Sequence, residues 1–261
     1  MSSSLINKVL VRQFGAIKPP WIDKETFYKL IFNFCDRWCE RCKLSRICRL
    51  YQKEKEREKR FIKQGIDPKS TKAMFLSICE SLEEAKRLLE NDMKRFKIKI
   101  TEEDYKKFEA DEERKDRLVK NNRLTQIATK LSYSLVKLVE DIHYYFLEEE
   151  IPEEIKGSLE ILTYYMHFFS VKIRRAVFSE IEEGEMKYED ITFDSKNSAF
   201  LSYVAIVKII NALENINNSK KIHFKIKQKV KKIIPLFYHL NAVLKERFKF
   251  GNFFNIYPAT P

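Results

Sequence analysis

At residues 124–142 the chain reads Leu124-Thr-Gln-Ile127-Ala-Thr-Lys-Leu131-Ser-Tyr-Ser-Leu135-Val-Lys-Leu138-Val-Glu-Asp-Ile142. The numbered apolar side chains recur every three or four residues, which is the period of one face of an α-helix. A helix with one apolar stripe is stabilised mainly by covering that stripe. This stretch therefore predicts a helix that packs against other helices in a bundle.

The same helical spacing recurs along most of the chain, and the composition leaves little room for strands. The 261 residues include only 5 glycines and 7 prolines, whereas a sheet-rich domain of this length needs many turns built from such residues. No two glycines lie within six residues of each other, which excludes the glycine-rich loops of P-loop and dinucleotide-binding enzymes. We therefore expect an all-α protein, a multi-helix bundle.

Candidate helix ends follow from capping residues. Asp23 is placed to cap the first helix, and Thr101-x-x-Asp104 has the form of a capping box. Ser70 or Thr71 is placed to begin a helix that carries an apolar stripe of its own. Pro235 falls inside the last expected helix and should kink or divide it.

That stripe comprises Met74, Phe75, Ile78, Leu82, Ala85 and Leu89. Cys79 lies beside Ile78 on the same helix. An isolated cysteine among apolar residues usually behaves as a small core side chain. We expect Cys79 to be buried.

Four further cysteines fall within fourteen residues: Cys35, Cys39, Cys42 and Cys48, spaced C-x3-C-x2-C-x5-C. Such crowding is typical of a soft metal held on thiolates. The first expected helix should run into these cysteines and place the first three on one face. Cys48 would then point away from that face. A four-sulfur site therefore requires a bend before Cys48, with Ser45 capping the helix that restarts.

Two metals remain open for this cluster. Structural zinc accepts four cysteines but favours two C-x2-4-C turns separated by a longer insert. A [4Fe–4S] cluster accepts short consecutive spacings, and the five-residue gap slightly favours it. Free or disulfide-linked cysteines are the remaining interpretation, and a reducing compartment disfavours disulfides.

The C-x2-C-x5-C half, Cys39 to Cys48, is similar to the cluster loop of endonuclease III-type DNA glycosylases and of RecB-like nucleases. In those families the [4Fe–4S] cluster is mainly structural and lies near DNA, so the resemblance implies a structural cluster near nucleic acid. No catalytic residue of either family has a counterpart here. The opening C-x3-C-x2-C half resembles radical-SAM enzymes, but these need a β/α barrel that a glycine-poor, strandless chain cannot build.

A wider pattern resembles an uncharacterised family of all-helical bacterial proteins. It combines Trp38 within the cysteine cluster with the downstream residues Glu160, Lys172, Arg175, Asp194 and Ser198. This resemblance implies an all-helical fold with an N-terminal cysteine cluster. It implies no particular activity.

Net charge points to polyanionic partners. The chain has 50 basic and 38 acidic residues, a formal charge of +12, and basic excess attracts phosphate backbones. We expect two groups of contacts to nucleic acid or another polyanion. They are Arg37, Arg41, Arg46 and Arg49 around the cysteines, and Lys225, Lys229 and Lys232 in the last helix.

A second candidate metal site uses carboxylates and histidines. Glu140 and His143 form an E-x-x-H pair, and Glu160 and His167 lie seven residues apart on one helix face. Carboxylate-bridged di-iron bundles use such pairs. The stronger interpretation is chance, because E-x-x-H arises easily in a glutamate-rich helix.

These patterns predict an irregular lead-in over residues 1–19, a cysteine metal module over 20–66 and a helical bundle over 67–261. The N-terminus lacks the features of a signal peptide, and no apolar stretch reaches the roughly 20 residues of a membrane span. We expect a cytoplasmic, metal-stabilised binding protein, possible partners including nucleic acid but not a membrane. The alternatives are an iron–sulfur electron carrier or redox enzyme and a di-iron oxidase, and whether the protein is an enzyme stays open.

Overall fold

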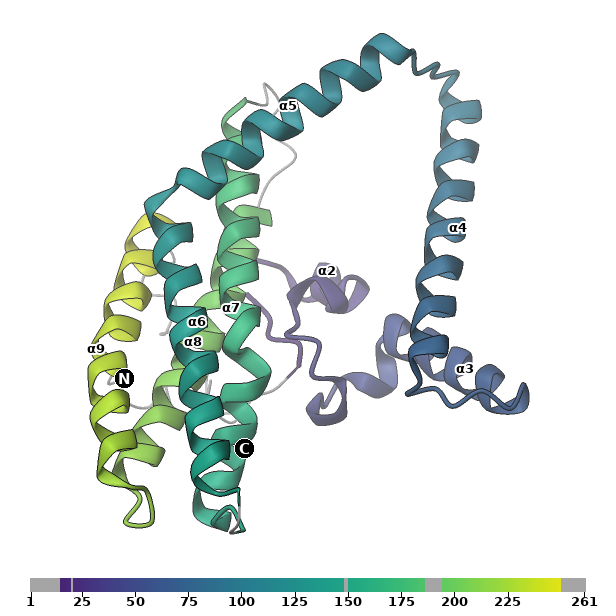
Figure 1. The fold of residues 1–261 in the computed structure, drawn as a ribbon. Helices are drawn as coiled ribbons and strands as arrows, with labels where there is room; N and C mark the ends of the chain where they lie inside the picture. Colours follow the sequence, from purple (N-terminus) through teal and green to yellow (C-terminus); the bar gives the residue numbers. More distant parts are fainter. Residues whose placement is uncertain (1–14, 20, 148–149, 186–193, 250–261) are drawn as a thin grey trace. The chain divides into compact units, whose positions relative to one another are not determined.

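The computed structural model describes residues 15–19, 21–147, 150–185 and 194–249 of the chain (Figure 1). The described residues are helical and form no strand; one isolated antiparallel bridge joins Ala16 to Cys35. The predicted all-α class is therefore confirmed. The α-helices are α2 Lys24–Lys29, α3 Arg49–Lys63, α4 Thr71–Phe96, α5 Glu102–Asn121, α6 Arg123–Tyr145, α7 Glu153–Glu185, α8 Asp194–Asn218 and α9 Phe224–Arg247. Three short 3₁₀ turns are η1 Ile31–Phe34, η2 Cys39–Arg41 and η3 Ser45–Ile47.

The capping residues read from the sequence perform as predicted. The Asp23 side chain accepts a hydrogen bond from the backbone N–H of α2, and Ser70 does the same for α4. Thr101 and Asp104 exchange the reciprocal bonds of a capping box before α5. These bonds satisfy amides that have no partner inside the helix. Helix α9 continues on both sides of Pro235, so the last helix is not divided there as the sequence allowed, and a kink stays a prediction.

The chain divides into two compact units, described separately below. The first contains residues 1–42 and 114–261, and the second contains residues 43–113. The division falls within α5 and immediately after Cys42. The domains expected from the sequence, 20–66 and 67–261, stay a prediction, because compactness and independent folding are different criteria.

The core of the first unit lies among α6, α7, α8 and α9 (Figure 1). The apolar stripe of α6 packs into this core, with Leu135 and Ile142 fully buried. Helix α8 is buried on nearly all sides and contacts α7 and α9. Among the described helices it is the one long and apolar enough to cross a membrane, yet most of its apolar stretch is buried inside this unit.

The cysteine segment departs from the predicted continuous helix. Helix α2 ends at Lys29, η1 follows, and Cys35 has extended backbone. Arg37 has a positive φ of 64°, which an α-helix does not tolerate. One contribution is local: the Asp36 side chain accepts the Trp38 backbone N–H, and such bonds compete with helical ones. The prediction that one helix carries the first three cysteines is therefore wrong.

The bend expected before Cys48 is present, but Ser45 does not cap the restarted helix. Ser45 begins η3, where no side-chain cap bond is made. Helix α3 begins at Arg49, with Cys48 itself at the N-cap position.

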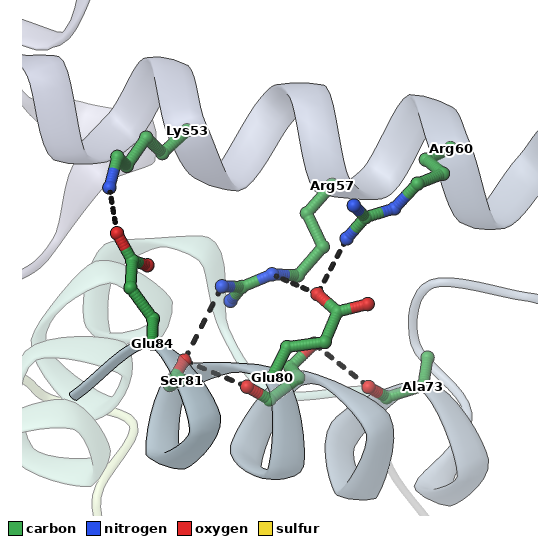
Figure 2. A network of polar contacts seen from close by, with 8 residues as sticks. Lys53, Arg57, Arg60, Ala73, Glu80, Ser81 and Glu84 are labelled. Carbon is green, nitrogen blue, oxygen red and sulfur yellow. Dashed lines mark hydrogen bonds and ion pairs between the residues drawn. The ribbon is translucent and has the colours of Figure 1, made fainter. Parts of the chain in front are cut away.

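In the second unit, α3 lies against α4 through polar side chains (Figure 2). Lys53 pairs with Glu84 at 2.9 Å, and Arg57 and Arg60 both pair with Glu80, at 3.2 and 2.5 Å. The Lys53 ammonium holds the pKa of the Glu84 carboxyl below its usual value. These ion pairs join the polar face of α3 to α4, and Phe61 is the buried apolar side chain of α3.

The apolar stripe of α4 is exposed rather than packed. Phe75 is 59% exposed, Leu82 64% and Leu89 58%. Cys79 is exposed as well, so its predicted burial is wrong. The periodicity found the stripe correctly, but periodicity does not say whether a partner covers it.

Candidate functional site

Three of the four predicted ligands lie in the first unit, in the loop between α2 and residue 43. Cys35 precedes the loop's buried aspartate, and Cys39 and Cys42 stand at the two ends of η2. The Cys42 backbone N–H donates to the Cys39 carbonyl at 3.2 Å. Residues three apart in a 3₁₀ turn lie on the same side, so η2 presents both side chains in one direction.

Two of the cysteines, Cys35 and Cys42, contact the short segment that contains Gly15. Its neighbour Ala16 makes the antiparallel bridge with Cys35. A Cβ placed on Gly15 would lie 2.3 Å from the Cys42 sulfur, well inside van der Waals contact. Gly15 also has a φ of +83°, a conformation that glycine adopts readily. The Cys42 thiol therefore occupies space that any other residue at position 15 would fill.

Asp36 fixes this loop to the bundle. The side chain is only 3% exposed. One carboxylate oxygen accepts the backbone N–H groups of Gly15 at 2.9 Å and Trp38 at 3.0 Å, and the other accepts the Tyr165 hydroxyl of α7. The Asp36 carbonyl accepts the Tyr164 hydroxyl at 2.9 Å. A buried carboxylate with three donors is well satisfied and is not available as a metal ligand.

Lys208 of α8 is the second buried charged group near this loop. It is fully buried, and its Nζ lies 5.8 Å from the centre of the Tyr165 ring. Burial lowers the pKa of Lys208 to about 8, although attraction to Asp36 opposes that change. Burial, followed by the Asp36 charge, raises the pKa values of Tyr164 and Tyr165 above their usual range. Both tyrosines therefore remain hydrogen-bond donors at neutral pH.

Trp38 is buried and packs the loop against α7. Its ring stacks on Tyr164 with centroids 4.1 Å apart and an interplanar angle of 10°. The Arg41 guanidinium lies 4.4 Å above the Trp38 ring and pairs with Glu160 of α7. Arg41, one of the predicted phosphate contacts, is thus engaged inside the unit.

In the structure none of the five cysteines is part of a disulfide, and the Cys35 sulfur donates to the Phe32 carbonyl at 3.4 Å. Among the described residues no group of three or more His, Cys, Asp or Glu side chains is placed to hold a metal ion. Metal binding here requires the thiols to lose their protons and turn, which is usual for sites whose formation is coupled to folding.

Cys48, the fourth predicted ligand, belongs to the second unit. It is buried at the end of η3, where its backbone N–H donates to the carbonyls of Leu44 and Ser45. Its membership of the site rests on sequence spacing alone. The donor set, four soft sulfurs on a short turn-rich segment, fits zinc or an iron–sulfur cluster.

The carboxylate–histidine site predicted in the bundle is not assembled in the described residues. Glu160 pairs with Arg41, and the His167 ring is in contact with the Ser132 hydroxyl at 3.2 Å. Glu140 and His143 are exposed on α6. The geometry offers no support for a di-iron site.

The remaining predicted phosphate contacts are on the surface. Arg37 lies in the cysteine loop, and Arg46 and Arg49 lie in the second unit; all three are exposed. In α9, Lys225 and Lys232 are exposed, as is Lys229, which also pairs with Asp141 at 2.5 Å.

Sequence reasoning missed Asp36, Tyr165 and Lys208 as one buried group. Lys208 carried a signal, because it interrupts an otherwise apolar stretch of a helix. Asp36 carried none, since its tyrosine partner is 129 residues away in the chain. Comparisons with protein family models, with curated proteins and with solved structures found no match to this chain.

Proposed function

We propose that this protein is a metal-stabilised binding protein of the cytoplasm. Cys35, Cys39, Cys42 and Cys48 supply four thiolates to a [4Fe–4S] cluster or to zinc, as the core of a small N-terminal cysteine module. Nucleic acid is the proposed partner, in keeping with the charge of +12.

The contact between Gly15 and Cys42 is the observation that most supports a built site. The chain uses one of its few glycines, in a left-handed conformation, to leave room at a cysteine sulfur. An ordinary packed thiol does not require such room. Ala16, the neighbour of Gly15, makes the antiparallel bridge with Cys35, so two proposed ligands contact the same short stretch of backbone.

The surrounding residues would hold the loop rather than react. Asp36 anchors the backbone at Gly15 and at Trp38, between the first two cysteines, and Trp38 with Tyr164 would shield this part of the loop from water. When bound, the metal would join loop segments that have little helical structure of their own. Thiolate–metal bonds contribute directly to folding free energy.

Metal analysis and a visible spectrum after anaerobic purification test the proposal. We expect about one zinc ion, or about four iron and four sulfide with broad visible absorption, per chain. Cys39→Ser should lose most of the metal. Cys79→Ser is the matched control and should keep it, because Cys79 is exposed on α4. A wild-type chain purified without stoichiometric metal would overturn the proposal.

Electron transfer is a second candidate, favoured by the stacked pair of Trp38 and Tyr164 beside Cys39. Aromatic rings in contact with a cluster loop offer a covered path to the surface. A reversible one-electron reduction of the purified protein would support it. A bound metal that shows no reversible reduction would contradict electron transfer and leave the structural role.

A further inference from the structure

The seam between α6 and α9 forms an exposed basic surface. The helices run antiparallel: Lys229 of α9 pairs with Asp141 of α6, and Arg247 reaches Asn122 at the opposite end. One turn along from that ion pair, the helical period places Lys137 of α6 beside Lys232 of α9. Both lysines are exposed and make no ion pair with any other described residue.

Two further lysines extend this surface in opposite directions. Lys130 lies two turns before Lys137 on α6, and Lys225 lies two turns before Lys232 on α9. In an ideal helix each such step is about 10 Å. Both side chains are exposed. Four lysines therefore border a single seam, which we call the α6/α9 surface.

Two tyrosines stand between these lysines. Tyr133 and Tyr144 lie four residues before and seven residues after Lys137, so the helical period puts all three on one face of α6. Tyr133 is 69% exposed and Tyr144 79%. Neither ring contacts another described aromatic ring. Exposed rings between cationic side chains are the elements with which proteins hold unpaired bases and their phosphates.

Besides Asp141, which is paired with Lys229, a second acidic residue lies near this face. Glu140 is exposed, three residues after Lys137. Its charge repels phosphate and lowers the affinity of the surface for a polyanion. Removing this negative charge should therefore increase the affinity for nucleic acid, which gives a test that does not depend on a loss of binding.

We propose that the α6/α9 surface binds single-stranded nucleic acid. Lys130, Lys137, Lys225 and Lys232 contact phosphates, and Tyr133 and Tyr144 stack on bases. A duplex offers the phosphates but hides the base faces, so the tyrosines favour a single strand. The inference rests on the nucleic-acid part of the proposed function and is independent of the metal centre.

Binding of the full chain to a labelled single-stranded oligonucleotide and to its duplex tests this inference over about 50 to 200 mM salt. We expect tighter binding to the single strand, with strong salt dependence. Lys137→Gln combined with Lys232→Gln should lower the slope of log affinity against log salt by about 1.4. The matched control combines Lys29→Gln with Lys156→Gln. Those exposed lysines already pair with Glu25 and Glu153, and the slope should not change.

The tyrosines and the glutamate separate stacking from charge. Tyr133→Ala and Tyr144→Ala should each weaken single-strand binding roughly 5- to 150-fold and leave duplex binding nearly unchanged. Glu140→Gln should strengthen binding about twofold to fivefold at low salt. All of these side chains are exposed, so thermal unfolding should be unaltered and serves as the folding check.

The outcomes distinguish the two proposals. A wild-type chain that binds neither oligonucleotide overturns the nucleic-acid part of the proposed function and this inference with it. Wild-type binding that survives the lysine variants as well as it survives the control overturns the α6/α9 surface alone. Lysine variants that act while tyrosine variants do nothing overturn the single-strand specificity.

Discussion

Helices α8 and α4 both have many apolar residues, but they differ in how far those residues are buried. Helix α8 is buried on nearly every side in the first unit. Helix α4 has a regular apolar stripe, but Phe75, Leu82 and Leu89 on it are more than half exposed. The two helices have similar lengths, 25 and 26 residues. The local sequence pattern therefore does not determine whether an apolar helix is buried; the presence of helices that pack against it does.

The difference in apolar burial implies a difference in the free energy that stabilises the two helices. Apolar burial contributes about 25 cal/mol per Å², so α8 is stabilised by the packed core. Helix α4 is joined to α3 by exposed ion pairs, each of which contributes about 0 to 1 kcal/mol. The second unit should therefore open at a lower free energy than the first.

Deleting the same atoms from each unit gives the largest expected contrast. Leu135→Ala, in the first unit, leaves a cavity at a fully buried site and should cost about 2 to 5 kcal/mol. Leu82→Ala, at a 64% exposed site in α4, should cost less than about 0.5 kcal/mol. Urea unfolding measures both. Equal losses would mean that α4 is covered in solution.

The buried Lys208 should give the first unit a distinctive pH dependence. Its folded pKa, about 8, lies below the ordinary 10.5. The unfolded chain therefore binds more protons between these values, and stability rises as pH increases from about 8 toward 10.5. The full difference corresponds to roughly 3 kcal/mol.

Comparing wild type with Lys208→Met over that pH range isolates this contribution. Asp36, Arg41 and Tyr165 also act on Lys208, but these groups are common to both proteins. The wild-type curve should climb relative to the variant. Parallel curves would show that Lys208 is hydrated rather than buried.

A pair of tyrosines tests the anchor of the cysteine loop. Tyr165→Phe removes the donor to one buried oxygen of Asp36 and should cost about 1 to 3 kcal/mol. Tyr164→Phe removes a donor to the Asp36 carbonyl at a half-buried site and should cost about 1 kcal/mol or less. Thermal or urea unfolding reports both. The reverse ranking would contradict the central place given to the Asp36 side chain.

The smallest effect is expected in the ion-pair network of Figure 2. Glu80→Gln removes the shared partner of Arg57 and Arg60 and should cost less than about 1 kcal/mol. The loss should shrink further at high salt, because exposed charges are screened. Hydrogen exchange of α3 amides is the measurement. A large, salt-independent loss would show that the network is better shielded than its exposure indicates.

Several features that depend only on near neighbours were predicted from the sequence. The all-α class and the capping roles of Asp23, Ser70 and Thr101 follow from spacing and side-chain chemistry within a few residues. The division of the last helix considered at Pro235 is an exception, because α9 continues through this residue.

Contacts between distant segments were beyond the same reasoning. The cysteine loop is shaped by Asp36, whose partners include Gly15 and Tyr165, far apart in the chain. The spacing of the residues predicted a helix from Cys35 to Cys42, because spacing does not include side-chain hydrogen bonds that compete with those of a helix. Coverage of α4, and hence the exposure of Cys79, likewise depends on what packs against it.

Gly15 has a consequence for how this chain tolerates change. In a library of all single substitutions, position 15 should reject every replacement, since each adds a carbon where the Cys42 sulfur lies. Gly65, also at positive φ but with open space around it, should accept asparagine. Gly157 and Gly184 should accept most side chains. A single hydrogen atom, the side chain of one residue, thus restricts how this chain can vary at the point where its cysteines gather.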